Sequence, residues 1–125
     1  MAIIGIDCDG TIMTHRFPLI GEDIGAIPVL KELVANGHYL VLWTLRGYSL
    51  LEEAVDWCDE RGIHFWGINQ NPEQHEWTDS PKAYCNCFID DAALGCPLIY
   101  PENGERAYVD WTAVRTQLVS MGYLQ

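Results

Sequence analysis

The sequence has 125 residues, 49% of them hydrophobic and 20% charged, which is the composition of an ordinary globular protein with one domain and a sizeable core. Its formal net charge of -11 argues against nucleic acid or an anionic membrane as a partner, because both bind basic surfaces. No apolar stretch approaches membrane-spanning length, and Met1-Ala2-Ile3 leads straight into apolar sequence without a basic region or cleavage site, so we expect a cytoplasmic protein without a signal peptide.

The first predicted element is a buried strand over residues 3–6, because the apolar run Ile3-Ile4-Gly5-Ile6 ends at a turn that contains glycine. The next residues are Asp7-Cys8-Asp9-Gly10-Thr11. Side chains alternate along an extended chain, so Asp7 and Asp9 point to the same side. Close carboxylates repel each other unless a cation lies between them, which favours a hard divalent metal such as magnesium. A solvated acidic turn is the alternative interpretation.

The rest of the chain alternates predicted helices with predicted strands. Helical spacing of apolar residues, capping residues and glycines predict helices over residues 24–35, 49–60 and 111–121, the second with a capping box formed by Ser49 and Glu52. Apolar runs predict strands over residues 39–43, 63–68, 87–89 and 98–100. This alternation predicts one α/β domain over residues 1–125, with a three-layer Rossmann-like fold and a mainly parallel sheet. Ligands of such sheets bind beyond the carboxyl ends of the strands.

Polar residues follow several of these strands. Thr44 ends the second strand and can donate a hydrogen bond to a phosphoryl oxygen, and Arg46 offers either a bidentate phosphate donor or a surface ion pair. Lys82 precedes the fourth strand, where it either screens negative charge at the site or is a solvated surface group. Asp90 and Asp91 end the fourth strand and add oxygen ligands for a metal, although Asp91 could instead cap a following helix.

The pentapeptide from Asp7 to Thr11 resembles the first motif, Asp-x-Asp-Gly-Thr, of the haloacid dehalogenase (HAD) superfamily. Thr44, Lys82 and the pair Asp90-Asp91 follow in the order of that family's second, third and fourth motifs. Nothing specific matches after Asp91. The spacing between the motifs leaves room for a small flap after the first motif but none for a large cap domain, so the chain resembles a minimal, capless member.

The resemblance implies a magnesium-dependent phosphomonoester hydrolase that works through an aspartyl-phosphate. Asp7 would be the nucleophile and Asp9 the general acid and base. Thr44 and Lys82 would hold the phosphoryl oxygens together with Mg²⁺. The expected metal ligands are the Asp7 carboxylate, the Asp9 backbone carbonyl and Asp90, with Asp91 in the outer shell or holding a water. The reverse assignment of Asp90 and Asp91 stays open. Gly10, Thr11 and Arg46 are the expected substrate-binding residues.

Two alternative functions remain open: a phosphoacceptor signalling domain, and an intact site that serves a protein scaffold. A phosphoacceptor domain of the response-receiver type also combines acids, a threonine, a lysine and magnesium on a parallel sheet, although the Asp-x-Asp-Gly-Thr order disfavours it. The missing cap also leaves open what shapes substrate choice. We expect His15 and Arg16 in the flap and Trp77 in the polar loop over residues 69–81 to contribute, with either a large phosphorylated substrate or a second subunit covering the site.

Overall fold

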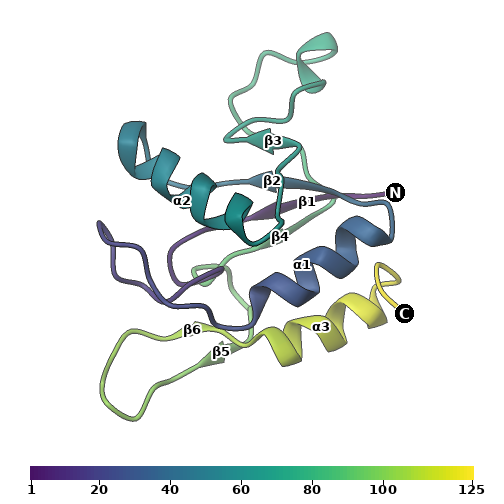
Figure 1. The fold of residues 1–125 in the computed structure, drawn as a ribbon. Coiled ribbons are helices and arrows are strands. Elements are labelled where there is room, and N and C mark those ends of the chain that lie inside the picture. The colour runs from purple at the N-terminus through teal and green to yellow at the C-terminus, as the bar shows by residue number, and fades with distance from the viewer.

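The first predicted strand lies inside a four-stranded parallel sheet (Figure 1). In this computed structural model, which describes residues 1–125, β1 (Ile3–Ile6) pairs with β2 (Tyr39–Leu42) and with β4 (Cys87–Ile89). The short strand β3 (Gly67–Ile68) pairs with the far side of β2, which gives the order β3-β2-β1-β4. All four carboxyl ends therefore meet at one edge of the sheet.

Three helices cover the sheet and bury its apolar side chains. They are α1 (Ala26–Ala35), α2 (Tyr48–Glu60) and α3 (Trp111–Ser120). One continuous core joins strand residues such as Ile4 and Leu40 to the apolar side chains of the helices, among them Leu30, Cys58 and Leu118. The helical spacing of these residues explains the arrangement, because each helix turns one apolar stripe toward the sheet.

The other face of β1 is covered by irregular chain. The segment between β3 and β4, which contains the short helix η1 (Gln74–Glu76), replaces the helix that usually links parallel strands. A Cβ at Gly5 would lie 2.6 Å from the Phe88 ring of β4 and 3.0 Å from the sulfur of Cys85 in this segment, so a side chain at Gly5 would displace both.

The last two strands form a separate antiparallel pair, β5 (Leu98–Ile99) and β6 (Tyr108–Val109). Its base is fastened to the loop that follows β1, because the Val109 amide donates to the Gly10 carbonyl at 3.0 Å. The Trp111 indole donates to the Thr11 carbonyl at 2.6 Å from the buried first turn of α3. These bonds hold the β5–β6 hairpin beside the carboxyl end of β1.

The α/β architecture and the parallel sheet are as predicted, and the three helices lie where expected. The capping box is wrong, since α2 begins at Tyr48 and has no side-chain cap bond at Gly47, which places Ser49 inside the helix. Of the expected strand over residues 63–68, only residues 67–68 form a strand. Asp110 caps α3, because its side chain accepts a hydrogen bond from the Ala113 amide at 3.2 Å.

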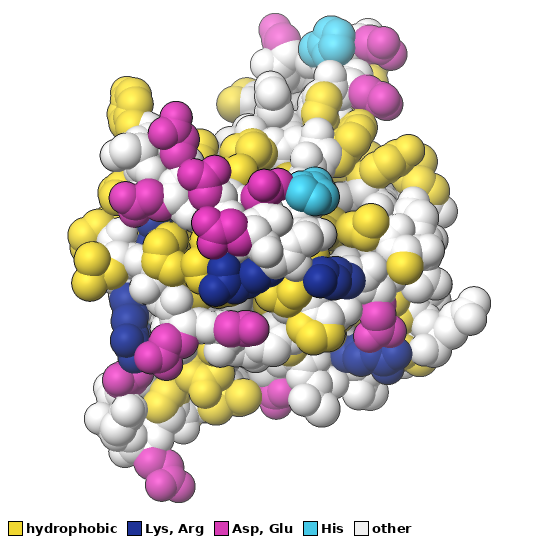
Figure 2. All heavy atoms as spheres, viewed as in Figure 1, with side chains coloured by type: hydrophobic (Ala, Val, Ile, Leu, Met, Phe, Trp, Pro, Cys, Tyr) yellow, Lys and Arg dark blue, Asp and Glu magenta, His cyan; other side chains and the backbone are white.

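The surface retains the acidic character of the composition. Acidic side chains gather at the upper left of the face in Figure 2, over α2, which contains five of them in its sequence. None of the helices combines the length and the apolar character needed to cross a membrane.

Candidate active site

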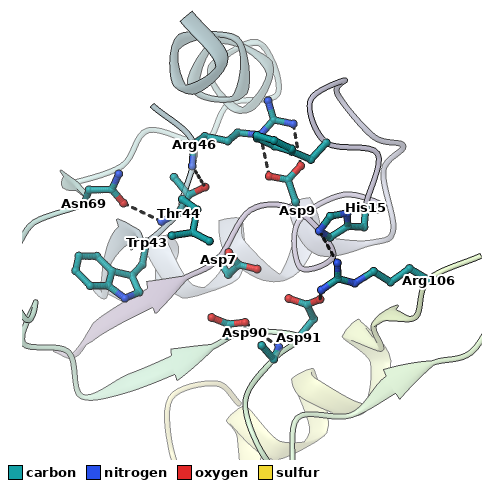
Figure 3. A pocket seen from close by; sticks show the side chains of 13 residues that line it. Asp7, Asp9, His15, Trp43, Thr44, Arg46, Asn69, Asp90, Asp91 and Arg106 are labelled. Atoms are coloured by element: carbon teal, nitrogen blue, oxygen red, sulfur yellow. Dashed lines mark hydrogen bonds and ion pairs between the residues drawn. The ribbon is translucent and has the colours of Figure 1, made fainter. Parts of the chain in front are cut away.

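A cavity of about 590 Å³ opens at the carboxyl edge of the sheet. Five parts of the chain line it: the segments that follow β1, β2, β3 and β4, and the loop between β5 and β6 (Figure 3). It is the edge at which parallel α/β sheets bind their ligands. The flap over residues 14–22 forms one wall and is closed by the Thr14 amide, which donates to the Glu22 carbonyl at 2.9 Å.

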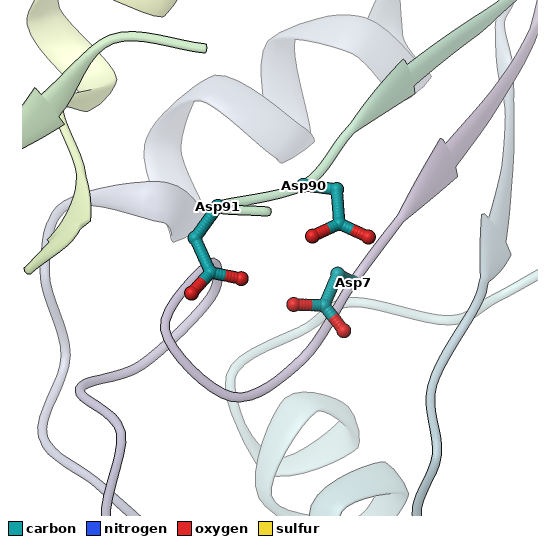
Figure 4. A group of neighbouring side chains, drawn as sticks. All are labelled: Asp7, Asp90 and Asp91. Carbon is teal, nitrogen blue, oxygen red and sulfur yellow. The ribbon is translucent and has the colours of Figure 1, made fainter. Parts of the chain in front are cut away.

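Three carboxylates converge in this cavity. Carboxylate oxygens of Asp7, Asp90 and Asp91 lie within 4.8 Å of one another, and Figure 4 shows their side chains at the ends of two neighbouring strands. The pairing of Ile6 with Ile89 places Asp7 next to Asp90, and the Asp7 amide donates to the Ile89 carbonyl at 3.0 Å. We call these three residues the acidic triad.

Gly10 and Thr11 organise the acidic triad and do not line the cavity. The Thr11 hydroxyl is fully buried, donates to Asp7 at 2.9 Å and accepts from the Asp91 amide at 3.0 Å. Gly10 has a φ of 84°, and a Cβ there would lie 2.5 Å from Asp91 Oδ2. The expected contact of these two residues with substrate is therefore replaced by a role in positioning the carboxylates.

The surroundings of Asp7 favour its protonated form. Burial above all, then the hydrogen bond with Asp91 and the charge of Asp90, raise the pKa of Asp7 to about 7, although the Thr11 hydrogen bond acts in the opposite direction. Three ionised carboxylates this close together need a compensating cation. Their donor atoms are all carboxylate oxygens, which suits a hard divalent cation such as Mg²⁺.

Asp9 lies apart from the acidic triad and pairs with Arg46. Arg46 Nε and Nη2 donate to the two Asp9 oxygens at 2.8 Å each, and the remaining donors reach the carbonyls of Leu19, Pro18 and Leu50. A guanidinium has five N–H groups, so all of them are used. Arg46 is also only 2% exposed. The predicted contact of Arg46 with phosphate is therefore not available in this arrangement.

Thr44 lies in the cavity wall, as its place after β2 predicts. Its hydroxyl accepts from the Arg46 amide at 3.1 Å, and its own amide donates to the Asn69 side chain at 2.8 Å. Asn69 directly follows β3 with a left-handed φ of 54° and also lines the cavity, as does Trp43. Neither Asn69 nor Trp43 is among the site residues expected from the sequence, although both directly follow strands, at the edge where such a sheet binds its ligands.

Lys82 does not reach the site. It is exposed and lines a separate cavity of about 320 Å³ together with Trp77 and Tyr84. The physical reason is its position before the amino end of β4, whereas Asp90 follows the carboxyl end of that strand. Trp77 lines this separate cavity and not the one that holds the carboxylates, so it does not shape the site as predicted.

The cation that does face the acidic triad is Arg106, in the β5–β6 loop. One guanidinium nitrogen lies 3.8 Å from Asp91 Oδ2, and another lies 3.0 Å from His15 Nε2 (Figure 3). Arg106 and His15 both line the cavity, whereas Arg16 does not. No strand-end pattern marks Arg106 in the sequence, because a long-range approach of the hairpin brings it there.

No model of a known protein family matches this chain, and no curated protein matches it significantly. Among solved structures, a conserved protein from Bacteroides thetaiotaomicron is 36% identical, with a TM-score of 0.77. The match covers 97% of this chain and 91% of that protein.

Proposed function

The chain belongs to the same family as the conserved protein from Bacteroides thetaiotaomicron, and we propose that it is a magnesium-dependent phosphomonoester hydrolase that acts through an aspartyl-phosphate. The observation that carries this proposal is the acidic triad in an open cavity at the carboxyl edge of the sheet. The triad includes Asp7, the residue that the HAD-like motif designates as nucleophile. The acidic surface does not exclude a phosphorylated substrate, since a metal and a local arginine can reverse the field at the site.

Asp7 is the proposed nucleophile. Its carboxylate oxygen attacks phosphorus in line, so the new Asp7–phosphorus bond forms while the bond from phosphorus to the leaving oxygen breaks. Water then attacks the phosphorus, and the Asp7–phosphorus bond breaks to release phosphate. The buried Thr11 hydroxyl and the β1–β4 pairing support this role, because they fix the Asp7 side chain toward the cavity.

Asp9 is the proposed general acid and base. It gives a proton to the leaving oxygen and later takes one from the attacking water. In the structure both Asp9 oxygens accept hydrogen bonds from Arg46. Each Asp9 oxygen has a second lone pair, which can carry the proton while Arg46 holds the carboxyl group in place. Arg46 is a positioning residue in this account, acting through Asp9 and not on the substrate.

Asp7, Asp90 and Asp91 would hold the metal, with the backbone carbonyl of Asp9 as a further expected ligand. Bound Mg²⁺ would offset the charge of the triad and polarise a phosphoryl oxygen. Thr44 lines the same cavity and offers a hydroxyl donor to the phosphoryl group.

Turnover of p-nitrophenyl phosphate by the purified protein tests the proposal. We expect hydrolysis that stops in excess chelator, returns with Mg²⁺ and is absent in Asp7→Asn. Asp56→Asn is the matched control, since Asp56 is an exposed carboxylate of α2 outside the cavity. Full activity in chelator or in Asp7→Asn would contradict the proposed chemistry. Stable phosphorylation without turnover would instead support the receiver-type alternative.

A further inference from the structure

We propose that Arg106, on the β5–β6 hairpin, binds the phosphoryl group of the substrate, the task that the sequence suggested for Lys82. This inference rests on the proposed function and adds a specific anion-binding residue to it. Arg106 lines the cavity, and one of its guanidinium nitrogens lies 3.8 Å from Asp91 Oδ2. An anion bound by Arg106 would therefore lie next to the acidic triad, as a phosphoryl group under attack by Asp7 must.

The hairpin holds Arg106 in a fixed place. Arg106 is three residues before Val109, whose amide donates to the carbonyl of Gly10. The buried Trp111 indole adds the bond to the Thr11 carbonyl from the residue after the Asp110 cap. The base of the hairpin is thus tied to the same loop that carries the proposed nucleophile. Movement of one relative to the other would break buried hydrogen bonds.

Arg106 also has donors to spare, in contrast to Arg46. Of its five N–H groups, one is used by His15 Nε2, and the approach to Asp91 at 3.8 Å is too long for a hydrogen bond. Its side chain is 60% exposed. The planar guanidinium can therefore offer two parallel N–H groups to two phosphoryl oxygens.

The charges in the cavity favour an anion beside Arg106. Arg46 is fully occupied by Asp9 and neighbouring carbonyls, which leaves the three carboxylates of the acidic triad and Arg106. A divalent cation together with Arg106 balances these three carboxylates. Without Arg106, a phosphate dianion would approach a site of net negative charge, which opposes its binding.

His15 positions Arg106 at the rim of the cavity, where the flap meets the β5–β6 hairpin. His15 and Arg106 meet on the cavity side, whereas their chain neighbours Arg16 and Glu105 form an exposed contact of 3.9 Å that does not line the cavity. A guanidinium only donates, so His15 Nε2 is the acceptor in the bond with Arg106. His15 therefore holds the guanidinium over the triad.

Binding of inorganic phosphate in the presence of Mg²⁺, measured by isothermal titration calorimetry, tests this inference without relying on turnover. Arg106→Ala should weaken phosphate binding by about 10- to 100-fold, the effect of losing charged hydrogen bonds. Arg106→Lys should recover part of it, because it keeps the charge without the planar fork. Lys31→Ala is the control, since Lys31 is an exposed cation of α1 outside the cavity, and it should bind phosphate like wild type. Thermal unfolding of each variant checks that it is folded.

Phosphate binding by Arg106→Ala that equals wild type would overturn the inference, as would a folded wild type that binds no phosphate. The proposed hydrolase activity fails separately. Phosphate binding that depends on Arg106 in a protein without turnover would support the anion site and refute the hydrolase. Turnover with an unchanged KM in Arg106→Ala would refute the role of Arg106 and leave the hydrolase intact.

Discussion

Replacing Asp90 with asparagine should stabilise the metal-free protein while removing its response to magnesium. The oxygens of the acidic triad lie within 4.8 Å of one another, so each pair of ionised carboxylates repels by about 1–3 kcal/mol at an effective dielectric constant between those of water and protein. Asparagine keeps the oxygen that accepts from the Ala92 amide at 2.8 Å, so the local turn can persist. We expect a gain of about 1–3 kcal/mol in the free energy of unfolding, and a rise in Tm of about 4 °C per kcal/mol for a chain of this size.

The sign of the pH dependence follows from Asp7. Its pKa is raised to about 7 in the folded protein, so ionising it costs stability as the pH rises through that value. The advantage of Asp90→Asn should therefore be larger at about pH 8, where Asp7 is mostly ionised, than at about pH 5.5, where Asp7 of the wild type is mostly protonated and the substitution relieves only the repulsion between Asp90 and Asp91.

Thermal unfolding in chelator and in Mg²⁺, at both pH values, measures these differences. Mg²⁺ at tenfold above its Kd should stabilise wild type by about 1.4 kcal/mol and leave Asp90→Asn almost unchanged. Asp56→Asn is the control for removing an exposed carboxylate outside the cavity. If Asp90→Asn were no more stable than wild type in chelator at the higher pH, or still gained as much from Mg²⁺, the reasoning about the acidic triad would be refuted.

Three further predictions concern the surroundings of the acidic triad. Because the pKa of Asp7 is raised to about 7, Mg²⁺ binding should release protons and weaken as the pH falls below that value, which calorimetry in two buffers of different ionisation enthalpy detects; an affinity independent of pH would contradict it. Arg46→Met should lower the free energy of unfolding in urea by about 3–5 kcal/mol because it leaves Asp9 unpaired, and a loss below 1 kcal/mol would show that the pair is dispensable. Trp111→Phe should cost about 1–3 kcal/mol by removing the buried donor to the Thr11 carbonyl, and an unchanged Tm would argue against that bond.

The central strands were predictable from the sequence because their signals are local. Each apolar run, such as Ile3–Ile6, ends at polar residues, and the parallel α/β pattern then places Asp7 and Asp90 at one edge. The end of the second strand at Thr44 followed from the same logic. These residues share a signal that is visible in a single sequence: a polar side chain that directly follows an apolar run.

The partners of the arginines were not predictable, because they depend on long-range geometry. Arg46 is 37 residues from Asp9 in the chain, and Arg106 is 91 residues from His15. Lys82 follows the order of the HAD motifs along the chain. It precedes the amino end of β4, however, whereas Asp90 follows the carboxyl end of that strand. Motif order predicts which charges a site needs, whereas the folded chain decides which residues supply them.

The central claim is that Asp7 becomes phosphorylated during turnover. The most direct measurement is acid quenching of the protein during hydrolysis of p-nitrophenyl phosphate in Mg²⁺, followed by borohydride reduction and peptide mass mapping. We predict that borohydride reduces the phosphorylated Asp7 carboxyl to an alcohol, which converts Asp7 to homoserine, and that no such product forms in Asp7→Asn. Modification at any other residue, or turnover that leaves Asp7 unmodified, would contradict it.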